Sequence, residues 1–563
     1  MRINGHAHIF NLHTVLTRHA VKIMVDRVRR QRVPDFVAEA LERFLNEQVK
    51  TPEYLVEEEL LDRFLRYIAS TKSFQKFAKQ TADLPVEVRI LGDGLRAARI
   101  GLLRDILTRL SAWFDEGADS DTTIADVFET LRLAMKADVV GVAAAVLEDM
   151  RDDDGLVALM MDITSERTHA EDEVKFLAQL AGTADAATAF PGRVFPFVAV
   201  NTRRPKHFDL MREAIERRGF VGVKLYPSLG VPVDSQAMMA VYEYCAANEL
   251  PILMHCTLTG FVESAATAEL SNPERWWPIL DRWPELYVCF AHTGGLAQGV
   301  LTPGGPTGSQ WPAVIEQLML SYENVYCDLA YHVDQMVSPK LEEYYLAWIR
   351  RLLGDEILRD RVMFGTDVWL VRLSMTDRAY WTWFERNLTA AEQDVVMTRA
   401  PAGFLGLPLD GRPMRQNIAR LVEALKVRPS VGGEPPAWLR ALHAWTISRV
   451  NPTWSPNNHA HRIAFGFFRG YMTGAQRQLP FDEAAALRLR QLSYWPGARK
   501  EDFDAIAQTL FIYCTGSQGA LEGDYRQNEA IGKLRELLAD GEKTLADTGA
   551  TIDAIFRFPT EIT

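Results

Sequence analysis

A series of short apolar runs, alternating with helical patterns between Gly155 and Asp367, constrains the fold of this chain most strongly. Each run has the length and composition of a strand buried on both faces, and strands separated by helices indicate right-handed βαβ units in a parallel sheet. The expected strands are Leu156–Ile163, Val194–Val200, Gly222–Tyr226, Ile252–His255, Tyr287–His292, Val325–Leu329 and Val362–Asp367. An eighth lies within the opening residues, M-R-I-N-G-H-A-H-I-F. Eight such strands close a (β/α)8 TIM barrel, which is the fold that we predict.

The rest of the chain has helical patterns. We expect a barrel formed by residues 1–10 and 155–425, a large helical insertion over 11–154, and a C-terminal helical extension over 426–563. Within the insertion, Pro34–Val49 and Pro52–Ala69 are amphipathic helix candidates. The insertion leaves from the catalytic end of the first strand, so it either caps the pocket or runs down the barrel flank, and we expect the two helical regions to pack together.

Charged residues of the insertion are expected on solvated helix faces, among them Arg27, Arg29, Arg30 and Arg32. The net charge of −12 argues against nucleic acid or an anionic membrane as the main partner. Five cysteines without paired spacing suit a reducing compartment. With no leader or membrane-spanning run in view, we expect a cytoplasmic protein that acts on a small molecule, with homo-oligomerisation left open.

Polar residues stand at the C-terminal ends of the expected strands, where a barrel keeps its active site. In an extended segment, residues i and i+2 face the same way, so His6 and His8 point together at one place. His255, His292 and Asp367 each close a later strand. Imidazoles with a carboxylate suit zinc or a similar divalent metal, with one position left open for water.

Lys224, in V-G-V-K-L-Y-P, also ends a strand and faces the same mouth. It is a carboxylated ligand that bridges to a second metal, a cation for a substrate carboxylate, or a buried lysine paired with an acid, and the sequence leaves these three interpretations open. Asp328 is expected to orient a ligating histidine, whereas Asp162 is ambiguous between pocket and packing.

The tripeptide His-Ala-His occurs a second time, from His459 to His461. It follows S-P-N-N, which resembles a helix start, and on a helix positions i and i+2 point in different directions. We therefore expect this second copy to be structural. Cys256, beside His255, is expected to be a small buried residue because strand alternation turns it away from the mouth.

Taken in order, G-H-A-H, G-V-K-L-Y-P, the histidine of the fifth strand, A-H-T-G-G and F-G-T-D resemble the amidohydrolase superfamily. The resemblance points to the amidohydrolase-related branch that includes aminocarboxymuconate semialdehyde decarboxylase. It covers the first ten residues and about Gly155 to Leu421, and it implies metal ligation by His6, His8, His255 and Asp367. It also implies that His292 is an acid/base or polarising residue near the metal. The insertion and the extension have no counterpart in compact members, so the substrate does not carry over.

These observations favour hydrolysis of a small amide, lactone or ester by a metal-activated water. Asp367 would take the proton of the water, and His292 would stabilise the oxyanion or protonate the leaving group. One zinc ion is favoured over two. The alternative is metal-dependent non-oxidative decarboxylation of an unsaturated or aromatic acid, with Lys224, Arg203 or Arg204 as a cation for the substrate. A second alternative is a non-catalytic barrel scaffold.

Overall fold

The computed structural model describes residues 1–427 apart from 31–32, 54, 56, 81–106, 108–122, 164–169, 297–309, 338 and 409–413. The chain divides into two compact units, Met1–Leu421 and Val422–Thr563, and the second is described only as far as Val427. The packing expected between the insertion and the C-terminal extension therefore lies outside the described residues. The second His-Ala-His copy, His459–His461, lies outside them as well. None of the described helices is long and apolar enough to cross a membrane.

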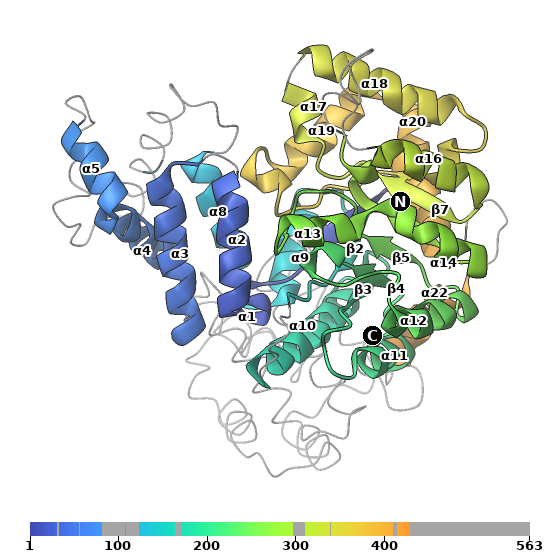
Figure 1. Ribbon diagram of the computed structural model, residues 1–563, viewed down its shortest axis with the longest axis horizontal. Helices are drawn as coiled ribbons and strands as arrows, with labels where there is room; N and C mark the ends of the chain where they lie inside the picture. Colours follow the sequence, from blue (N-terminus) through green and yellow to red (C-terminus); the bar gives the residue numbers. More distant parts are fainter. Residues whose placement is uncertain are drawn as a thin grey trace, which may run out of the picture. The chain divides into compact units, whose positions relative to one another are not determined.

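Eight parallel strands form one sheet, in which each strand pairs with the next one along the chain. They are β1 (Ile3–His8), β2 (Gly155–Leu159), β3 (Val194–Val200), β4 (Gly222–Leu225), β5 (Ile252–Met254), β6 (Val288–Phe290), β7 (Val325–Asp328) and β8 (Val362–Met363). The sheet closes on itself because Gly5 N donates a hydrogen bond to Phe364 O, and Asp367 N donates one to His6 O, each at 2.8 Å. The predicted (β/α)8 barrel is confirmed (Figure 1).

The strands are buried along their whole length, which explains why they read as continuous apolar runs. Several end earlier than the sequence predicted. β5 stops at Met254, β6 at Phe290 and β8 at Met363. His255, His292 and Asp367 therefore lie in the loops directly after their strands, at the carboxyl end of the barrel.

Helices follow most strands and surround the barrel (Figure 1). The longer ones are α10 (Ala170–Ala189), α11 (His207–Arg218), α12 (Gln236–Ala247), α14 (Trp277–Arg282), α16 (Trp311–Ser321), α18 (Pro339–Gly354), α19 (Asp377–Asn387), α21 (Ala400–Leu405) and α22 (Gln416–Val427). The shorter ones are α13 (Ala265–Ala268), α17 (Val333–Val337) and α20 (Ala390–Asp394). Buried Asn417 ties α22 to the barrel, since its side-chain amide donates to Val221 O and Leu405 O, both at 2.9 Å.

Helices also fill the described part of the chain between β1 and β2. They are α1 (Leu12–Val15), α2 (Arg18–Arg30), α3 (Asp35–Lys50), α4 (Glu57–Ser70), α5 (Lys72–Gln80), α8 (Ile124–Ala134) and α9 (Val139–Glu148). The amphipathic segments expected from Pro34 and Pro52 are α3 and α4, so both helices are confirmed. In α3 the buried residues include Val37, Leu41 and Phe44, which recur at helical spacing and form one apolar face.

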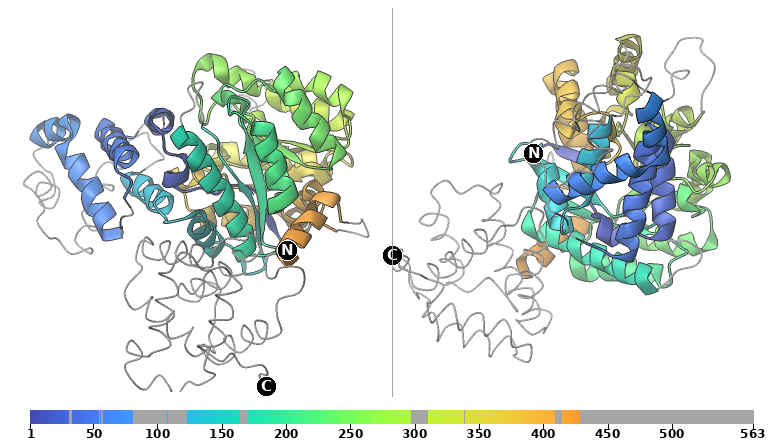
Figure 2. Two further views of the ribbon diagram at one scale, coloured as in Figure 1. Left: turned by 90° about the horizontal axis from the view of Figure 1, so that it is seen from below. Right: turned by 90° about the vertical axis from the view of Figure 1, so that its left-hand side faces the viewer.

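Helix α2 attaches the insertion to the loops at the carboxyl end of the barrel. Arg30 donates to Gly260 O at 3.1 Å in the loop after β5, and Arg27 donates to the Tyr331 hydroxyl at 2.9 Å in the loop after β7. In Figure 1, α2 stands between α3 and the barrel, and Figure 2 shows the same group of helices on one side of the barrel. Of the two expected arrangements, these contacts favour the one in which the insertion lies beside the active-site end.

Candidate metal centre

His6, His8 and Asp367 converge at the carboxyl end of β1. His6 Nε2 lies 3.6 Å and His8 Nε2 lies 3.8 Å from Oδ1 of Asp367. The ligand atoms of the three residues all lie within 4.8 Å of one another, and all three side chains are buried. The pair arises because β1 is extended, so Ala7 turns away while its two neighbours share a face. We call these three residues the His6–Asp367 group.

Backbone geometry brings Asp367 to β1. Its amide donates to His6 O at 2.8 Å, and it adopts a φ of 65°, which is rare for a residue with a side chain. A Cβ on the nearby Gly365 would lie 2.6 Å from the Cβ of His6, so only glycine allows this approach. His292 also has a positive φ, of 57°. Such strained conformations persist where the surrounding structure fixes them, and they cluster at functional sites.

Asp328, the last residue of β7, holds two of the histidines in place. His6 Nδ1 and Asp328 Oδ2 are 2.8 Å apart, while Asp328 Oδ1 accepts hydrogen bonds from the backbone N–H of His292 at 2.7 Å and of Ala330 at 3.1 Å. His6 Nδ1 therefore carries the proton, and its Nε2 is left as a lone pair toward Asp367. This is the arrangement expected of a residue that orients a ligating histidine.

His292 faces the His6–Asp367 group from the turn after β6. Its Nε2 lies 4.0 Å from Asp367 Oδ2, and its Nδ1 is 3.0 Å from Ala330 O, which can only accept. The neutral ring therefore has its proton on Nδ1 and a lone pair on Nε2. The possible ligand atoms of His6, His292 and Asp328 also lie within 4.8 Å of one another. However, Asp328 already accepts the three hydrogen bonds described above.

His255 borders the group without being among the three residues with the closest ligand atoms. Its ring centroid is 5.1 Å from that of His292, and it stacks on Tyr226 at 4.0 Å. Its Nε2 is 3.1 Å from Thr259 O, in the loop after β5, while its buried Nδ1 has no hydrogen-bond partner among the residues that the structure describes. The role of His255 as a metal ligand thus stays a prediction.

Lys224 lies within the centre, with Nζ 3.5 Å from His6 Nε2 and only 1% of the residue exposed. Burial lowers the pKa of Lys224 to about 8, against the opposing charges of Asp367 and Asp328. Burial likewise raises the pKa of Asp367 to about 8, and the charge of Lys224 opposes that change. The positive charge of Lys224 and the negative charge of Asp367 therefore stabilise each other. This agrees with both the paired-lysine and the substrate-cation interpretations.

Arg203 and Arg204 are each held by a carboxylate outside the His6–Asp367 group. Arg203 makes two hydrogen bonds to Glu263, at 2.6 and 3.1 Å. Arg204 binds both oxygens of Asp162 at 2.7 Å, and this pair is buried. Asp162 thus packs as the partner of Arg204. A role for either arginine in substrate binding stays a prediction.

Sequence reasoning missed Arg27, which it placed on a solvated helix face. That expectation was wrong, because Arg27 is only 6% exposed. Arg29 and Arg30 are exposed as expected, while Arg32 lies outside the described residues. The signal was in the sequence, since Arg27 follows Ile23 by four residues and Met24 by three, so it continues the apolar face of α2. The expectation for Cys256 agrees with its full burial.

The donors fit a divalent transition metal. Burial lowers the pKa of the four site histidines well below the ordinary value, so their rings are neutral at physiological pH, as metal ligation requires. Among the described residues, the buried Nδ1 atoms of His8 and His255 have no hydrogen-bond partner. Neutral imidazoles with one carboxylate are the donor set of many zinc sites, so the residues present suit such an ion.

Residues 148–407 match the amidohydrolase family model. This confirms the resemblance that the motifs predicted, and with it the expectation that the chain is an enzyme. A search of curated proteins finds no match.

Three of the solved structures that are similar to this chain have low sequence identity to it. A 5-carboxyvanillate decarboxylase from Novosphingobium aromaticivorans is 14% identical, covering 57% of this chain and 92% of its own, with a TM-score of 0.35. A probable 2-pyrone-4,6-dicarboxylic acid hydrolase from Acinetobacter baumannii is 11% identical, with 48% and 89% covered and a TM-score of 0.35. An uncharacterised TIM-barrel protein from Bordetella bronchiseptica is 18% identical, with 45% and 77% covered and a TM-score of 0.33.

Proposed function

We propose that this chain, whose residues 148–407 match the amidohydrolase family model, is a metal-dependent hydrolase of a small amide, lactone or ester. One observation carries the proposal. The carboxylate of Asp367 stands between the histidine pair of β1 and the Nε2 of His292, at 3.6 to 4.0 Å from each ring. A single carboxylate can therefore contact a metal site on one side and pass a proton to a base on the other.

His6, His8 and Asp367 would hold the metal, with His255 joining from the loop after β5. We propose one ion, most simply zinc, because imidazole and carboxylate donors suit it. When bound, such an ion lowers the pKa of a bound water from 15.7 toward about 7 and polarises a substrate carbonyl.

Asp367 would receive the proton of the attacking water at a carboxylate oxygen. His292 would then take that proton at Nε2, where its neutral ring carries a lone pair. The resulting Nε2–H would be the donor for the developing oxyanion or for the leaving group.

Two further residues set the positions of these groups. Asp328 keeps the Nε2 lone pair of His6 directed at the centre, and its bonds to the turn after β6 hold His292 in its strained conformation. Lys224 supplies a positive charge that compensates the carboxylate inside a buried site. Both would act on the reaction through the residues that they hold.

Decarboxylation is the second candidate, favoured by one specific observation. Two cationic side chains, Lys224 and Arg27, are buried near Asp367, and their charges act on its carboxylate. Cations in such a place suit a substrate that carries a carboxylate of its own. The family branch that the motifs resemble also includes enzymes that release carbon dioxide.

The test compares both reactions in the purified, metal-loaded full chain. A panel of lactones, esters and amides is followed with a pH indicator, and carbon dioxide release is followed from aromatic and unsaturated acids. We expect hydrolysis of at least one compound, and a loss of roughly 10²- to 10⁴-fold in Asp367→Asn. Asp394→Asn, which changes an exposed carboxylate on α20, is the matched control. Carbon dioxide release without hydrolysis would decide for the second candidate, and no turnover in either assay would favour a scaffold.

A further inference from the structure

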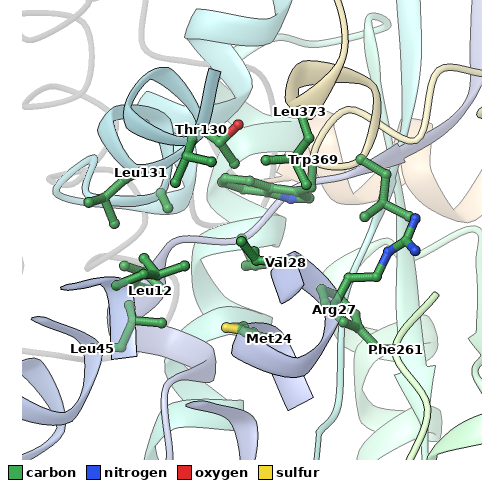
Figure 3. A pocket seen from close by; sticks show the side chains of 15 residues that line it. Leu12, Met24, Arg27, Val28, Leu45, Thr130, Leu131, Phe261, Trp369 and Leu373 are labelled. Atoms are coloured by element: carbon green, nitrogen blue, oxygen red, sulfur yellow. The ribbon is translucent and has the colours of Figure 1, made fainter. Parts of the chain in front are cut away.

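An apolar pocket lies where the insertion meets the barrel. Phe10 and Trp369 line it from the barrel, and Leu12, Val28 and Leu131 line it from the insertion. It encloses a cavity of about 90 Å³ and is partly open to solvent. Small-molecule pockets in proteins are commonly apolar, with few polar groups. Figure 3 shows Arg27 and Phe261 on one side of the space, with Leu45 and Leu131 on the opposite side.

Arg27 is the charged residue of this pocket. Arg27 is buried, and its guanidinium has few polar contacts with the described residues. One Nη atom donates to the Tyr331 hydroxyl at 2.9 Å, and the guanidinium lies 5.5 Å from the centre of the Tyr331 ring. Within the described part of the chain, Nε of Arg27 has no hydrogen-bond partner. Among the described residues no carboxylate forms an ion pair with it within 4 Å. A buried cation with no carboxylate in direct contact is unfavourable, so an anionic group of a ligand would stabilise it.

The pocket and the metal centre share a wall. Trp369 stacks on Phe10 at 4.8 Å, and its indole N–H donates to the backbone oxygen of His8 at 2.9 Å. A ligand in the pocket, with an anionic group at Arg27, would therefore lie beside the reacting groups.

We propose that Arg27 and the apolar pocket form a substrate subsite for an amphiphilic acid. The apolar body of the molecule, aliphatic or aromatic, would occupy the pocket, and its carboxylate would bind the guanidinium of Arg27. This inference rests on the proposed function, and it narrows the substrate to amides, lactones or esters that carry a free carboxylate next to an apolar group. The insertion would then select the substrate while the barrel performs the chemistry.

A purely structural role for Arg27 makes a different prediction. If Arg27 only fastens α2 to Tyr331, the charge of a ligand has no effect on its binding. The affinities of two probes with similar shape and different charge therefore distinguish the two roles.

The experiment titrates 4-phenylbutyrate and the neutral 4-phenylbutanol into the full chain by calorimetry, as purified and after chelator treatment. We expect the acid to bind at least about tenfold more tightly than the alcohol, because a charge-assisted hydrogen bond is stronger than a neutral one. This preference should disappear in Arg27→Met and persist in Arg29→Met, which removes an exposed charge from the same helix. Val28→Phe fills the pocket and should weaken both probes about equally.

The inference is overturned by equal binding of the two probes to the wild type, by no binding of either, or by a preference that survives in Arg27→Met. If thermal melting shows that Arg27→Met is unfolded, Val28→Phe decides, because undiminished binding there excludes the pocket. The chelated arm separates this inference from the proposed function. Charge-dependent binding in a protein without hydrolase activity would support the subsite and reject the hydrolase. If the protein hydrolyses small neutral esters but binds the two probes equally, the hydrolase is supported and the subsite is rejected.

Discussion

His6 donates a hydrogen bond from Nδ1 to Oδ2 of Asp328 across 2.8 Å, between two side chains that are both fully buried. Asp328 is the last residue of β7. It fixes the ring of His6 and the proton on Nδ1, so that Nε2 is directed to the place where His8 and Asp367 converge. The relationship therefore assigns Asp328 a positioning role with a measurable consequence for metal affinity.

Replacing Asp328 with asparagine should lower metal affinity by about 10- to 100-fold, the range found when such supporting partners are removed. Asparagine offers one carbonyl oxygen and one NH2 group, so it cannot accept from both His6 and the turn after β6. Competition with a chelating dye measures the affinity. Asp281→Asn, which alters an exposed carboxylate bonded to Tyr322, is the control. A metal affinity within twofold of that of the wild type would show that Asp328 does not position His6 for metal binding.

His255→Ala should release the metal together with the activity. The expectation follows from its place beside His292 and from its buried Nδ1, which has no hydrogen-bond partner in the described part of the chain. Elemental analysis of the purified variant gives the result directly. His207→Ala, a histidine on α11, should keep its metal. Full occupancy in the His255 variant would show that His255 is not a ligand.

Gly260→Ala should disturb the metal centre through His255. A Cβ at Gly260 would lie 2.7 Å from the Tyr226 hydroxyl and 2.8 Å from Cε1 of His255, and the residue has a φ of +85°. The left-handed backbone alone should cost about 1–3 kcal/mol of unfolding free energy. Gly192→Ala is a matched control, because Gly192 has a φ of +75° and a Cβ added there would meet no atom within 4 Å. Both variants should be destabilised in urea melts, but only Gly260→Ala should lose metal affinity.

His13→Gln should reduce the acid sensitivity of the fold. Burial, helped by the charge of Lys175, lowers the pKa of His13 to about 4. Between pH 6.5 and 4 the unfolded chain therefore binds a proton that the folded protein does not, so His13 makes stability fall as the pH drops through this range. Urea melts at pH 7 and pH 5 should show a smaller loss of unfolding free energy in the variant. Equal losses in the two proteins would contradict this assignment.

The barrel could be predicted from sequence because its strands are buried on both faces. Runs such as Val194–Val200 are then apolar throughout, and their number and spacing determine the architecture. Strand ends were less predictable. His292 and Asp367 follow their strands in positive-φ conformations, which hydrogen bonds to distant parts of the chain impose. Local propensity carries no information about such contacts.

The histidine and aspartate side chains of the centre could be found because strand ends in a barrel meet at one face. The position of Arg27 could not, since it depends on how the insertion packs against the loop that holds Tyr331. Arg203 and Arg204 illustrate the opposite difficulty. Sequence marks them as cations near a strand end, but it does not show that Glu263 and Asp162 hold them. Tertiary partners decide which charges are available to a substrate.

The metal content of the purified full chain shows whether the His6–Asp367 group holds an ion. Elemental analysis should find about one equivalent of a divalent transition metal per chain, as a mononuclear site requires. The same measurement on His8→Ala should find almost none, because it removes one donor of the His6–Asp367 group. A wild-type protein that holds no stoichiometric metal, even after incubation with zinc and gel filtration, would contradict the account.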